Sequence, residues 1–426
     1  MDQQSFIAIG IFLLTYGLII AEKVHRTIIA MTGSLIMITV GIMTQESALH
    51  HIDFNTIGLL IGMMIIVSIT GQTGVFNYIA VKATQFAKAN PIRVLIMLGL
   101  VTAFGSAFLD NVTTVLLMVP VTFKITQQLK VNPIPYLITE IFASNIGGTS
   151  TMIGDPPNIM IGSAVKELTF NAFIDHLFLI SFFILFVTVG ILAFWYRKDL
   201  KTTDELKEML LKKNAREEIT DSKLLAKCLL ALTVTIGGFF LHQFVHIETA
   251  TISLIGAFLL LFLTGEKYLD HALEKVEWTT LFFFIGLFVI VGGLVETGVI
   301  STLAKKTIAL TGGEIVPTTF LILWVSAIAS AFIDNIPFVA TMIPLIKEMG
   351  NSGIQNLEPL WWSLALGACL GGNGTLIGAS ANLVVAGLAS KEGYHISFKR
   401  FLVIGFPVML LSIIISSIYI WFRYLS

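Results

Sequence analysis

Long apolar segments separated by short polar loops run through most of this 426-residue chain. Several approach the roughly 20 residues that a membrane-spanning helix needs, whereas others are too short to cross a bilayer alone. The segments cover residues 5–20, 28–44, 56–75, 94–109, 112–123, 135–165, 178–196, 226–241, 250–264, 279–297, 318–333, 336–346, 360–390 and 401–423. Only 12% of the side chains are charged, about half the fraction usual in soluble domains. The pattern predicts an all-α polytopic membrane protein.

Charged residues concentrate in one stretch near the middle of the chain. This stretch divides the apolar chain into two halves. We therefore predict an N-terminal transmembrane repeat over residues 1–196, a cytoplasmic charged linker over 197–225 and a C-terminal inverted transmembrane repeat over 226–426. No basic residue precedes the first apolar segment, so we expect a retained helix rather than a cleaved signal peptide. With Cys228 and Cys369 as the two cysteines, we expect no disulfide framework.

A shift of 224 positions aligns the two halves of the sequence without a gap. It places "GGTSTMIGDPPN" (147–158) over "GGNGTLIGASAN" (371–382), with six of the twelve positions identical. It also places residues 104–124 over 328–348, where the identical pairs are Ser106/Ser330, Ala107/Ala331, Phe108/Phe332, Asp110/Asp334, Asn111/Asn335, Val115/Val339, Met118/Met342 and Pro120/Pro344. Internal symmetry of this kind is typical of transporter folds. The chain is therefore an internal duplication.

The basic residues predict how the two halves lie in the membrane. If segments 94–109 and 112–123 form a re-entrant hairpin, each half has five crossings, one hairpin and one broken helix, and an odd number of crossings inverts the second half. With both termini outside, the inside loops are 22–26, 75–93, 124–134, 197–227, 265–277 and 391–400. These loops hold 21 of the 26 Lys and Arg residues, as the positive-inside rule requires.

Polar and helix-breaking residues predict where the site lies. A hairpin that turns back within the bilayer leaves backbone groups unpaired at its tip, which only protein or a watery cavity can satisfy. The tips read "FLDN" (108–111) and "FIDN" (332–335). Helix-breaking residues also lie within the apolar segment 135–165, where a helix should be continuous. They are Gly147, Gly148, Gly154, Pro156 and Pro157. The ends of broken helices bind ions near the midplane in alternating-access transporters.

Two sets of candidate residues follow from these motifs. The candidates for the coupling ion are Asp110, Asn111, Asp334, Asn335, Gly154 and Gly378, of which Asp110, Asn111, Asp334 and Asn335 would be the Na⁺ ligands. The candidates for substrate binding are Thr113, Thr149, Ser150, Thr151, Asp155, Asn158, Asn373, Thr375 and Asn382. Charges at bilayer depth are costly and usually functional.

Each candidate also has a structural interpretation. Aspartates at the tips can cap the returning helices, and glycines can allow close helix packing. Hydroxyl groups in membrane helices often bond to their own backbone. Asp155 is replaced by Ala379 in the second half, so its role stays open between structure and function. Cys369 aligns with Asn145 and stands alone, so we expect no thiolate cluster for arsenite.

The stretches "FLDNVTTVLLMVP" and "SNIGGTSTMIGDPPNIMIGSA" resemble the ion transporter superfamily, in the branch of arsenite permeases, NhaD-type sodium–proton antiporters and the P protein. Divalent anion:sodium symporters are related, and their tips read Ser-Asn-Thr. The resemblance implies sodium held between each tip and its broken helix, and a homodimer. At these tips Asp110 and Asp334 replace the symporters' serine, and Val112 and Ile336 replace threonine. Two carboxylates beside an anionic substrate argue against a citrate or succinate site.

The sequence thus predicts a secondary active transporter, not an enzyme, coupled to H⁺ or Na⁺ through Asp110 and Asp334. We expect Na⁺/H⁺ exchange or extrusion of arsenite or antimonite, with sodium-coupled transport of a citrate-like dicarboxylate or another small anion as the alternative. A channel and an intramembrane aspartyl protease are more remote alternatives.

The expected setting is a bacterial plasma membrane, without cofactor or nucleic acid and with a separate ATPase subunit only for an arsenite pump. No Arg or Lys is expected inside the site, because Arg93, Lys124 and Lys347 fall at the hairpin bases.

The charge asymmetry gives a direct test of orientation. Single cysteines placed near Asn214 should resist a membrane-impermeant thiol reagent applied to intact cells, because the linker is predicted to be cytoplasmic. Cysteines near His50 should react, because that loop is predicted to be outside. The reverse labelling pattern would contradict the inverted-repeat topology.

Overall fold

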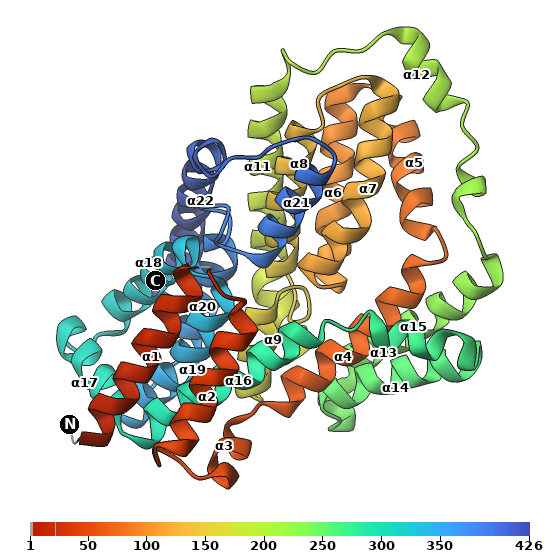
Figure 1. The fold of residues 1–426 in the computed structure, drawn as a ribbon. Coiled ribbons are helices and arrows are strands. Elements are labelled where there is room, and N and C mark those ends of the chain that lie inside the picture. The colour runs from red at the N-terminus through yellow and green to blue at the C-terminus, as the bar shows by residue number, and fades with distance from the viewer. Residues whose placement is uncertain (1–2, 22) are drawn as a thin grey trace.

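The computed structural model describes residues 3–21 and 23–426, and each regular element in those ranges is a helix. Residues 1, 2 and 22, the last of them in the predicted loop 22–26, lie outside the described part. By length and composition, nine of the described helices are apolar enough to cross a membrane, or ten if a pair bent by 119° at Gly265 counts as one span. The all-α polytopic architecture is confirmed (Figure 1).

The helices of the first repeat begin with five, α1 to α5, that lie ahead of the hairpin region. The first repeat consists of α1 (Gln3–Ala21), α2 (Arg26–Thr39), α3 (Gln45–His51), α4 (Phe54–Gly71), α5 (Val75–Phe86), α6 (Pro91–Phe108), α7 (Asn111–Leu129), α8 (Ile134–Thr149), α9 (Pro156–Ala164), α10 (Phe170–Phe173) and α11 (Leu179–Tyr196), the last two joined by a π-helical turn over Ile174–Phe178. Helices α6 and α7 are the predicted hairpin, and α8 and α9 are the predicted broken helix.

The second repeat reproduces this order about 224 residues later. It consists of α13 (Ser222–Val245), α14 (Thr249–Thr264), α15 (Leu269–Glu274), α16 (Trp278–Glu296), α17 (Val299–Thr311), α18 (Ile315–Phe332), α19 (Asn335–Asn351), α20 (Glu358–Gly371), α21 (Ser380–Lys391) and α22 (Phe398–Ile420). A 3₁₀ turn precedes α15 and a π-helical turn follows α22. The short helices α3 and α15, which hydropathy treats as loops, are equivalent in the two repeats.

Each hairpin tip lies against the break of the broken helix in its own repeat. Ser106 Oγ donates to the carbonyl of Ser144 at 2.7 Å, and its equivalent Ser330 donates to the carbonyl of Ala368 at 2.6 Å. The hydroxyl groups of Thr151 and Thr375, which lie in the breaks, donate to the carbonyls of Ala107 and Ala331 near the tips. The hairpins thus reach the level at which α8 and α20 end, part of the way along each broken helix.

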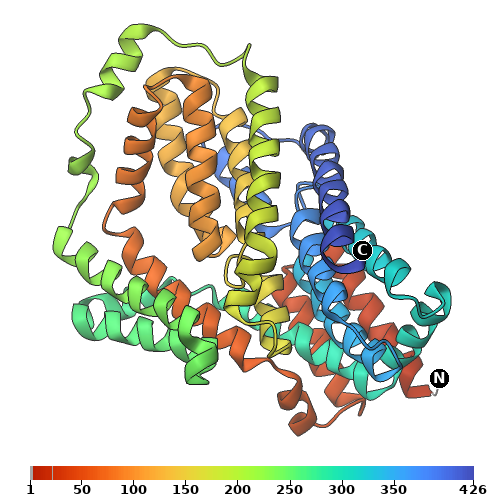
Figure 2. The same cartoon turned by 180° about the vertical axis from the view of Figure 1, so that it is seen from behind.

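The two repeats interlock rather than lie side by side. Helix α2 packs against α16 and α4 packs against α14, and each pair joins helices of different repeats. At the centre, α8 packs against α20, α7 against α21 and α9 against α19. Both views show the three groups that result: the first hairpin with α8 and α11, the second hairpin with α1, α2 and α16, and the group of α4, α13 and α14 (Figures 1 and 2).

The charged linker passes along the first hairpin group as an open arch that carries α12 (Asp204–Leu211) and a 3₁₀ turn (Ala215–Glu218) (Figure 2). Thr202 Oγ1 donates to the carbonyl of Leu129 at 2.6 Å, and Gln85 Nε2 donates to the carbonyl of Lys213 at 2.6 Å. Three of the loops predicted to be cytoplasmic therefore share one face of the molecule. The orientation of that face stays a prediction.

Glycines allow the close contact between hairpin and broken helix. A Cβ atom on Gly147 of α8 would lie 2.1 Å from the carbonyl oxygen of Ala103 in α6. A Cβ on the equivalent Gly371 of α20 would lie 2.6 Å from the carbonyl oxygen of Ala327 in α18. Because both obstacles are backbone atoms, a larger residue cannot be accommodated by a side-chain movement.

Replacing Gly147 with Ala should therefore destabilise the protein, since overpacking costs roughly 1–3 kcal/mol even where side chains can adjust. The matched control is Gly190→Ala in α11, where a Cβ meets nothing within 4 Å and Ala favours the helix. Thermal unfolding in detergent should show a lower melting temperature for Gly147→Ala alone. Equal melting temperatures for the two variants would contradict the packing argument.

Candidate functional site

A cavity of about 600 Å³ lies between the two hairpin tips and is lined by both repeats. The lining includes Asp110 and Asn111 of the first tip, and Asp334 and Asn335 of the second. Lys23, Val24 and His25 at its rim are exposed, so the cavity reaches the surface on the side of loops 22–26 and 265–277. The other lining residues are Ile19, Ile20, Arg26, Leu60, Met64, Val112, Leu116, Asp155, Pro156, Glu277, Thr280, Phe332, Ile333, Ile336, Ile377, Ser380, Leu383 and Val384.

Asp110 occupies the N-cap position of α7. Its carboxylate accepts hydrogen bonds from the backbone N–H of Thr113 at 2.9 Å and from the Thr113 hydroxyl. This is the usual way in which Asp satisfies the first N–H groups of a helix. The carboxylate takes part in no ion pair within residues 3–21 and 23–426. A capped carboxylate at the edge of a cavity remains available to bind a cation.

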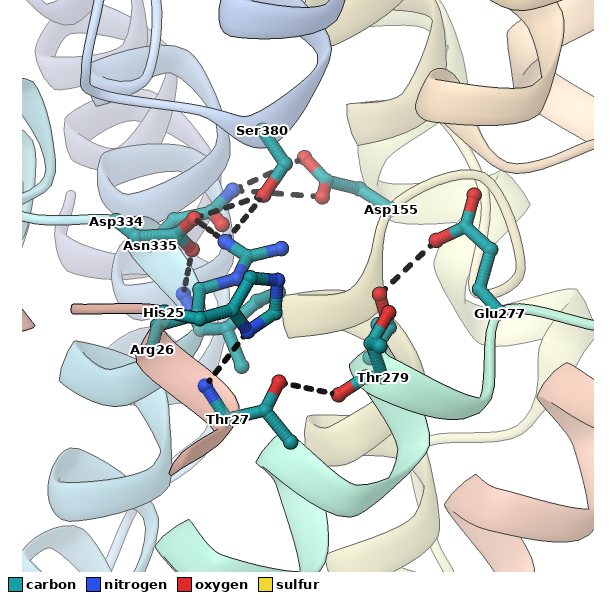
Figure 3. A network of polar contacts seen from close by, with 11 residues as sticks. His25, Arg26, Thr27, Asp155, Glu277, Thr279, Asp334, Asn335 and Ser380 are labelled. Atoms are coloured by element: carbon teal, nitrogen blue, oxygen red, sulfur yellow. Dashed lines mark hydrogen bonds and ion pairs between the residues drawn. The ribbon is translucent and has the colours of Figure 1, made fainter. Parts of the chain in front are cut away.

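Asp334 occupies the equivalent N-cap of α19, but its surroundings differ. It accepts from the backbone N–H of Ile336 at 3.1 Å and from Ser380 Oγ at 2.8 Å. Arg26 Nη1 lies 2.8 Å from Asp334 Oδ2 and also 2.8 Å from Ser380 Oγ. The guanidinium lies 4.9 Å from the ring centre of Phe283. Figure 3 shows the arginine between the second tip and Ser380.

The position of Arg26 corrects the expectation that the site holds no Arg or Lys. Arg26 begins α2, and its side chain joins a tip that is 308 residues away in sequence. Hydropathy assigns residues 22–26 to a surface loop, yet the side chain of Arg26 at the end of that loop reaches the second tip. The charge of the site is therefore less negative than the sequence suggests.

Buried amides connect the two repeats behind the cavity. Asn111 Nδ2 donates to Asn145 Oδ1 at 3.3 Å, and Asn145 Nδ2 donates to the side chains of Asn373 and Asn382 at 2.9 Å each. Asn335 Nδ2 lies 3.4 and 3.5 Å from the two carboxylate oxygens of Asp155. Each tip asparagine thus contacts the broken-helix region, and the second tip does so across the repeat boundary.

Most of the candidates for substrate binding lie around the breaks and satisfy the backbone there. Asn158 Nδ2 donates to the carbonyls of Thr149 and Thr151 at 3.0 and 2.9 Å, and Asn382 Nδ2 donates to those of Gly372 and Thr375 at 2.7 and 3.0 Å. The hydroxyls of Thr149, Ser150, Thr151 and Thr375 also donate to backbone carbonyls.

The two glycines among the coupling-ion candidates, Gly154 and Gly378, also lie in the breaks. A Cβ on Gly154 would lie 2.5 Å from the carbonyl oxygen of Ser106, and one on Gly378 would lie 2.8 Å from that of Gly372. Neither glycine lines the cavity, and neither do Thr113, Thr149, Ser150, Thr151, Asn158, Asn373, Thr375 and Asn382. Asp110, Asn111, Asp155, Asp334 and Asn335 are the candidates that the fold brings together at the cavity.

At the position equivalent to Glu277, hydrogen bonds join α4 to α9 and α14. Asp53, which caps α4, accepts from Ser163 of α9 at 2.7 Å, and Asn55 Nδ2 donates to the same hydroxyl at 3.1 Å. Asn55 Oδ1 also accepts from the backbone N–H of Ala250 in α14 at 3.0 Å. The repeat equivalent of Asp53 is Glu277, which bonds to Thr280 at 3.0 Å and lines the open cavity.

Sequence reasoning missed several residues at or beside the cavity, namely Lys23, His25, Arg26, Asn145, Glu277 and Ser380. A signal was present for Glu277, because the 224-residue shift aligns it with Asp53 and both precede a long apolar helix. Asn145 directly precedes the "IGGTST" motif but aligns with a cysteine, so the repeat gave no indication of it.

Comparisons with known proteins agree with this architecture. An uncharacterized transporter of Mycobacterium tuberculosis is 43% identical over 427 residues, which cover 99% of each chain. The human P protein is 37% identical over 502 residues that cover 99% of this chain and 60% of the P protein.

A solved structure and a family profile complete the comparison. The YdaH transporter of Alcanivorax borkumensis, whose structure has an unusual topology, superposes with a TM-score of 0.60 over 99% of both chains at 12% identity, which shows a shared fold. The profile of the citrate transporter family matches residues 16–367. The resemblance to the ion transporter superfamily is thereby confirmed, and the chain belongs to the citrate transporter family of membrane transporters.

Proposed function

We propose that this protein is a secondary active transporter that exchanges Na⁺ for H⁺ by alternating access, with Asp110 as the site of the coupling cation. The cavity between the tips is the observation that carries the proposal. It is open on the side of Arg26 and Glu277, whereas at the equivalent position in the other repeat Asp53 and Asn55 are bonded to Ser163 and so join α4 to α9. Inverted repeats that exchange these two arrangements would expose the tips to each side in turn.

Asp110 supports the assignment of the coupling site. Asp110 lines the cavity, and the Thr113 hydroxyl lies beside its carboxylate as a further oxygen atom. Hard cations prefer oxygen ligands of these types. Because the carboxylate is partly removed from water and takes part in no ion pair among the described residues, it can exchange a proton for a cation.

The charge of the lining favours a cation over an anion as the transported ion. Four carboxylates line the cavity, those of Asp110, Asp155, Glu277 and Asp334, against the fixed positive charges of Lys23 and Arg26. A cavity with excess negative charge concentrates cations. A neutral species such as undissociated arsenite also fits this field, and its extrusion remains part of the proposal.

A second candidate is cation-coupled transport of a citrate-like carboxylate. Two observations favour it: Arg26 places a guanidinium in the cavity, and the matching family is described as citrate transporters. Guanidinium groups recognise carboxylates with paired hydrogen bonds. In this structure Arg26 is engaged by Asp334 and Ser380, so an anion would compete with a carboxylate of the protein.

The setting of the transporter is also proposed. We infer a bacterial plasma membrane with both termini outside, and a homodimer as in the related symporters. A separate ATPase subunit would be needed only if the substrate is arsenite.

Asp110→Asn should abolish Na⁺/H⁺ exchange. The amide keeps the capping geometry, but it cannot exchange a proton for a cation. The measurement is Na⁺-induced proton movement in everted membrane vesicles, with expression and melting temperature followed in parallel. Asp204→Asn in the exposed linker is the control and should exchange ions normally. Normal exchange by Asp110→Asn would show that the Asp110 carboxylate is structural.

The two candidate substrates can be separated in proteoliposomes. Na⁺/H⁺ exchange should be measurable in the absence of any carboxylate, and citrate or succinate should not be required. Arsenite, Li⁺ and phosphate belong in the same panel. Sodium-dependent dicarboxylate uptake, without exchange when the dicarboxylate is omitted, would favour the second candidate instead.

A further inference from the structure

We propose that the guanidinium of Arg26 permanently occupies the second of two equivalent cation sites, so that the transporter carries one coupling cation per cycle. The inference rests on the proposed role of Asp110. It concerns the number of coupling ions, which the duplicated sequence alone would set at two.

The two tip aspartates are equivalent in backbone and position. Asp110 and Asp334 lie 224 residues apart, each is the N-cap of the second hairpin helix, and each lines the same cavity. Each is followed by an asparagine that is 3% exposed. A duplication that kept all of these features would supply two similar cation sites.

The residues around the two aspartates are not equivalent. Arg26, Ser380 and Phe283 surround the second tip, and the positions that match them in the other repeat are Ala250, Pro156 and Leu59. None of these three can provide a positive charge, a hydroxyl group or an aromatic ring. The cluster that holds a guanidinium therefore exists at one tip of the two.

The first tip carries a hydroxyl group at a position where the second tip has a proline. Thr113, whose hydroxyl donates to Asp110, is matched by Pro337 at the second tip. A small cation at Asp110 could use the Thr113 oxygen as a further ligand, and proline offers no such group. The first tip thus offers a hydroxyl oxygen beside an aspartate that has no arginine partner, whereas at the second tip the Ser380 hydroxyl is shared with Arg26.

A second contact attaches the α1–α2 arm, which carries Arg26, to the second hairpin. The Tyr16 hydroxyl in α1 donates to the carbonyl of Pro337 at 2.8 Å and lies 3.2 Å from Thr341 Oγ1. The matching residue in the other repeat is Phe240, which has no hydroxyl. The α1–α2 arm that carries Arg26 is therefore attached to the second hairpin at two places, the tip side chain and the tip backbone.

Electrostatics makes the two occupants of Asp334 mutually exclusive. The Asp334 side chain is 11% exposed and the Arg26 side chain is 28% exposed, so their charges are only partly screened by water. A cation entering this site would meet the guanidinium at contact distance. Expelling the arginine would break a partly buried ion pair and the hydrogen bond from Arg26 to Ser380, both of which the entering cation would have to replace.

Equilibrium binding of radioactive Na⁺ to the purified full-length protein tests the inference. We expect one ion per chain for the wild type, none for Asp110→Asn, and still one for Asp334→Asn. Arg26→Ala should bind two ions, because Asp334 becomes available, and Arg26→Ala/Asp110→Asn should bind one. Arg26→Lys keeps the positive charge and should bind one.

The possible failures are distinguishable. A wild-type protein that binds two ions, or loss of an ion in Asp334→Asn, would overturn the role of Arg26 while leaving Asp110 as a coupling site. A wild-type protein that binds no Na⁺ would contradict the proposed Na⁺/H⁺ exchange itself. If Arg26→Ala does not fold, the Asp334→Asn result still decides the question, and Arg26→Ala/Asp334→Asn, which buries no unpaired charge, should bind one ion.

Discussion

The need to satisfy backbone groups at the centre of a bilayer governs this structure. Interrupted helices expose N–H and C=O groups where lipid offers no partner, so the protein must supply one. Asn158 and Asn382, which lie after the breaks, donate to carbonyls at the end of the preceding half-helix and within the interruption. Glycines at 147 and 371 let the hairpin backbones approach closely enough for Thr151 and Thr375 to reach them. The proposed ion site depends on these contacts, because they hold the two tips and the two breaks together.

The sequence predicted the architecture because its signals are local or periodic. Apolar segment lengths, the 224-residue shift and the positions of Gly and Pro each reflect a constraint within one repeat, and α6 and α18 indeed start and end 224 residues apart. Asp110 and Asp334 could be identified for the same reason, since both occur inside apolar stretches. Their common position at one cavity follows from the hairpins.

The remainder of the site depends on contacts that no local signal records. Arg26 meets Asp334 across 308 residues, and hydropathy indicates neither the depth of a short loop nor the direction of its side chains. Asn145 meets Asn382 across 237 residues, and its equivalent is a cysteine. Arg26 and Asn145, which sequence reasoning missed, have no counterpart of the same kind in the other repeat, whereas the tip pairs Asp110/Asp334 and Asn111/Asn335 preserve the symmetry and were found.

The linker has a mechanical consequence for the first repeat. Helix α5 connects the end of α4 to the base of the first hairpin, and the linker runs beside it, bonded to Thr73 at one end of α5 and to Gln85 at the other. The linker thus holds the hinge helix α5 at both of its ends. In the second repeat, α17 joins α16 to α18, and the equivalent of Thr73 is Thr297, whose carbonyl accepts from Ser5 Oγ of α1 at 2.9 Å. The two related repeats consequently have hinges that are held by different parts of the chain, the first by the linker at both ends of α5 and the second by α1 at the start of α17.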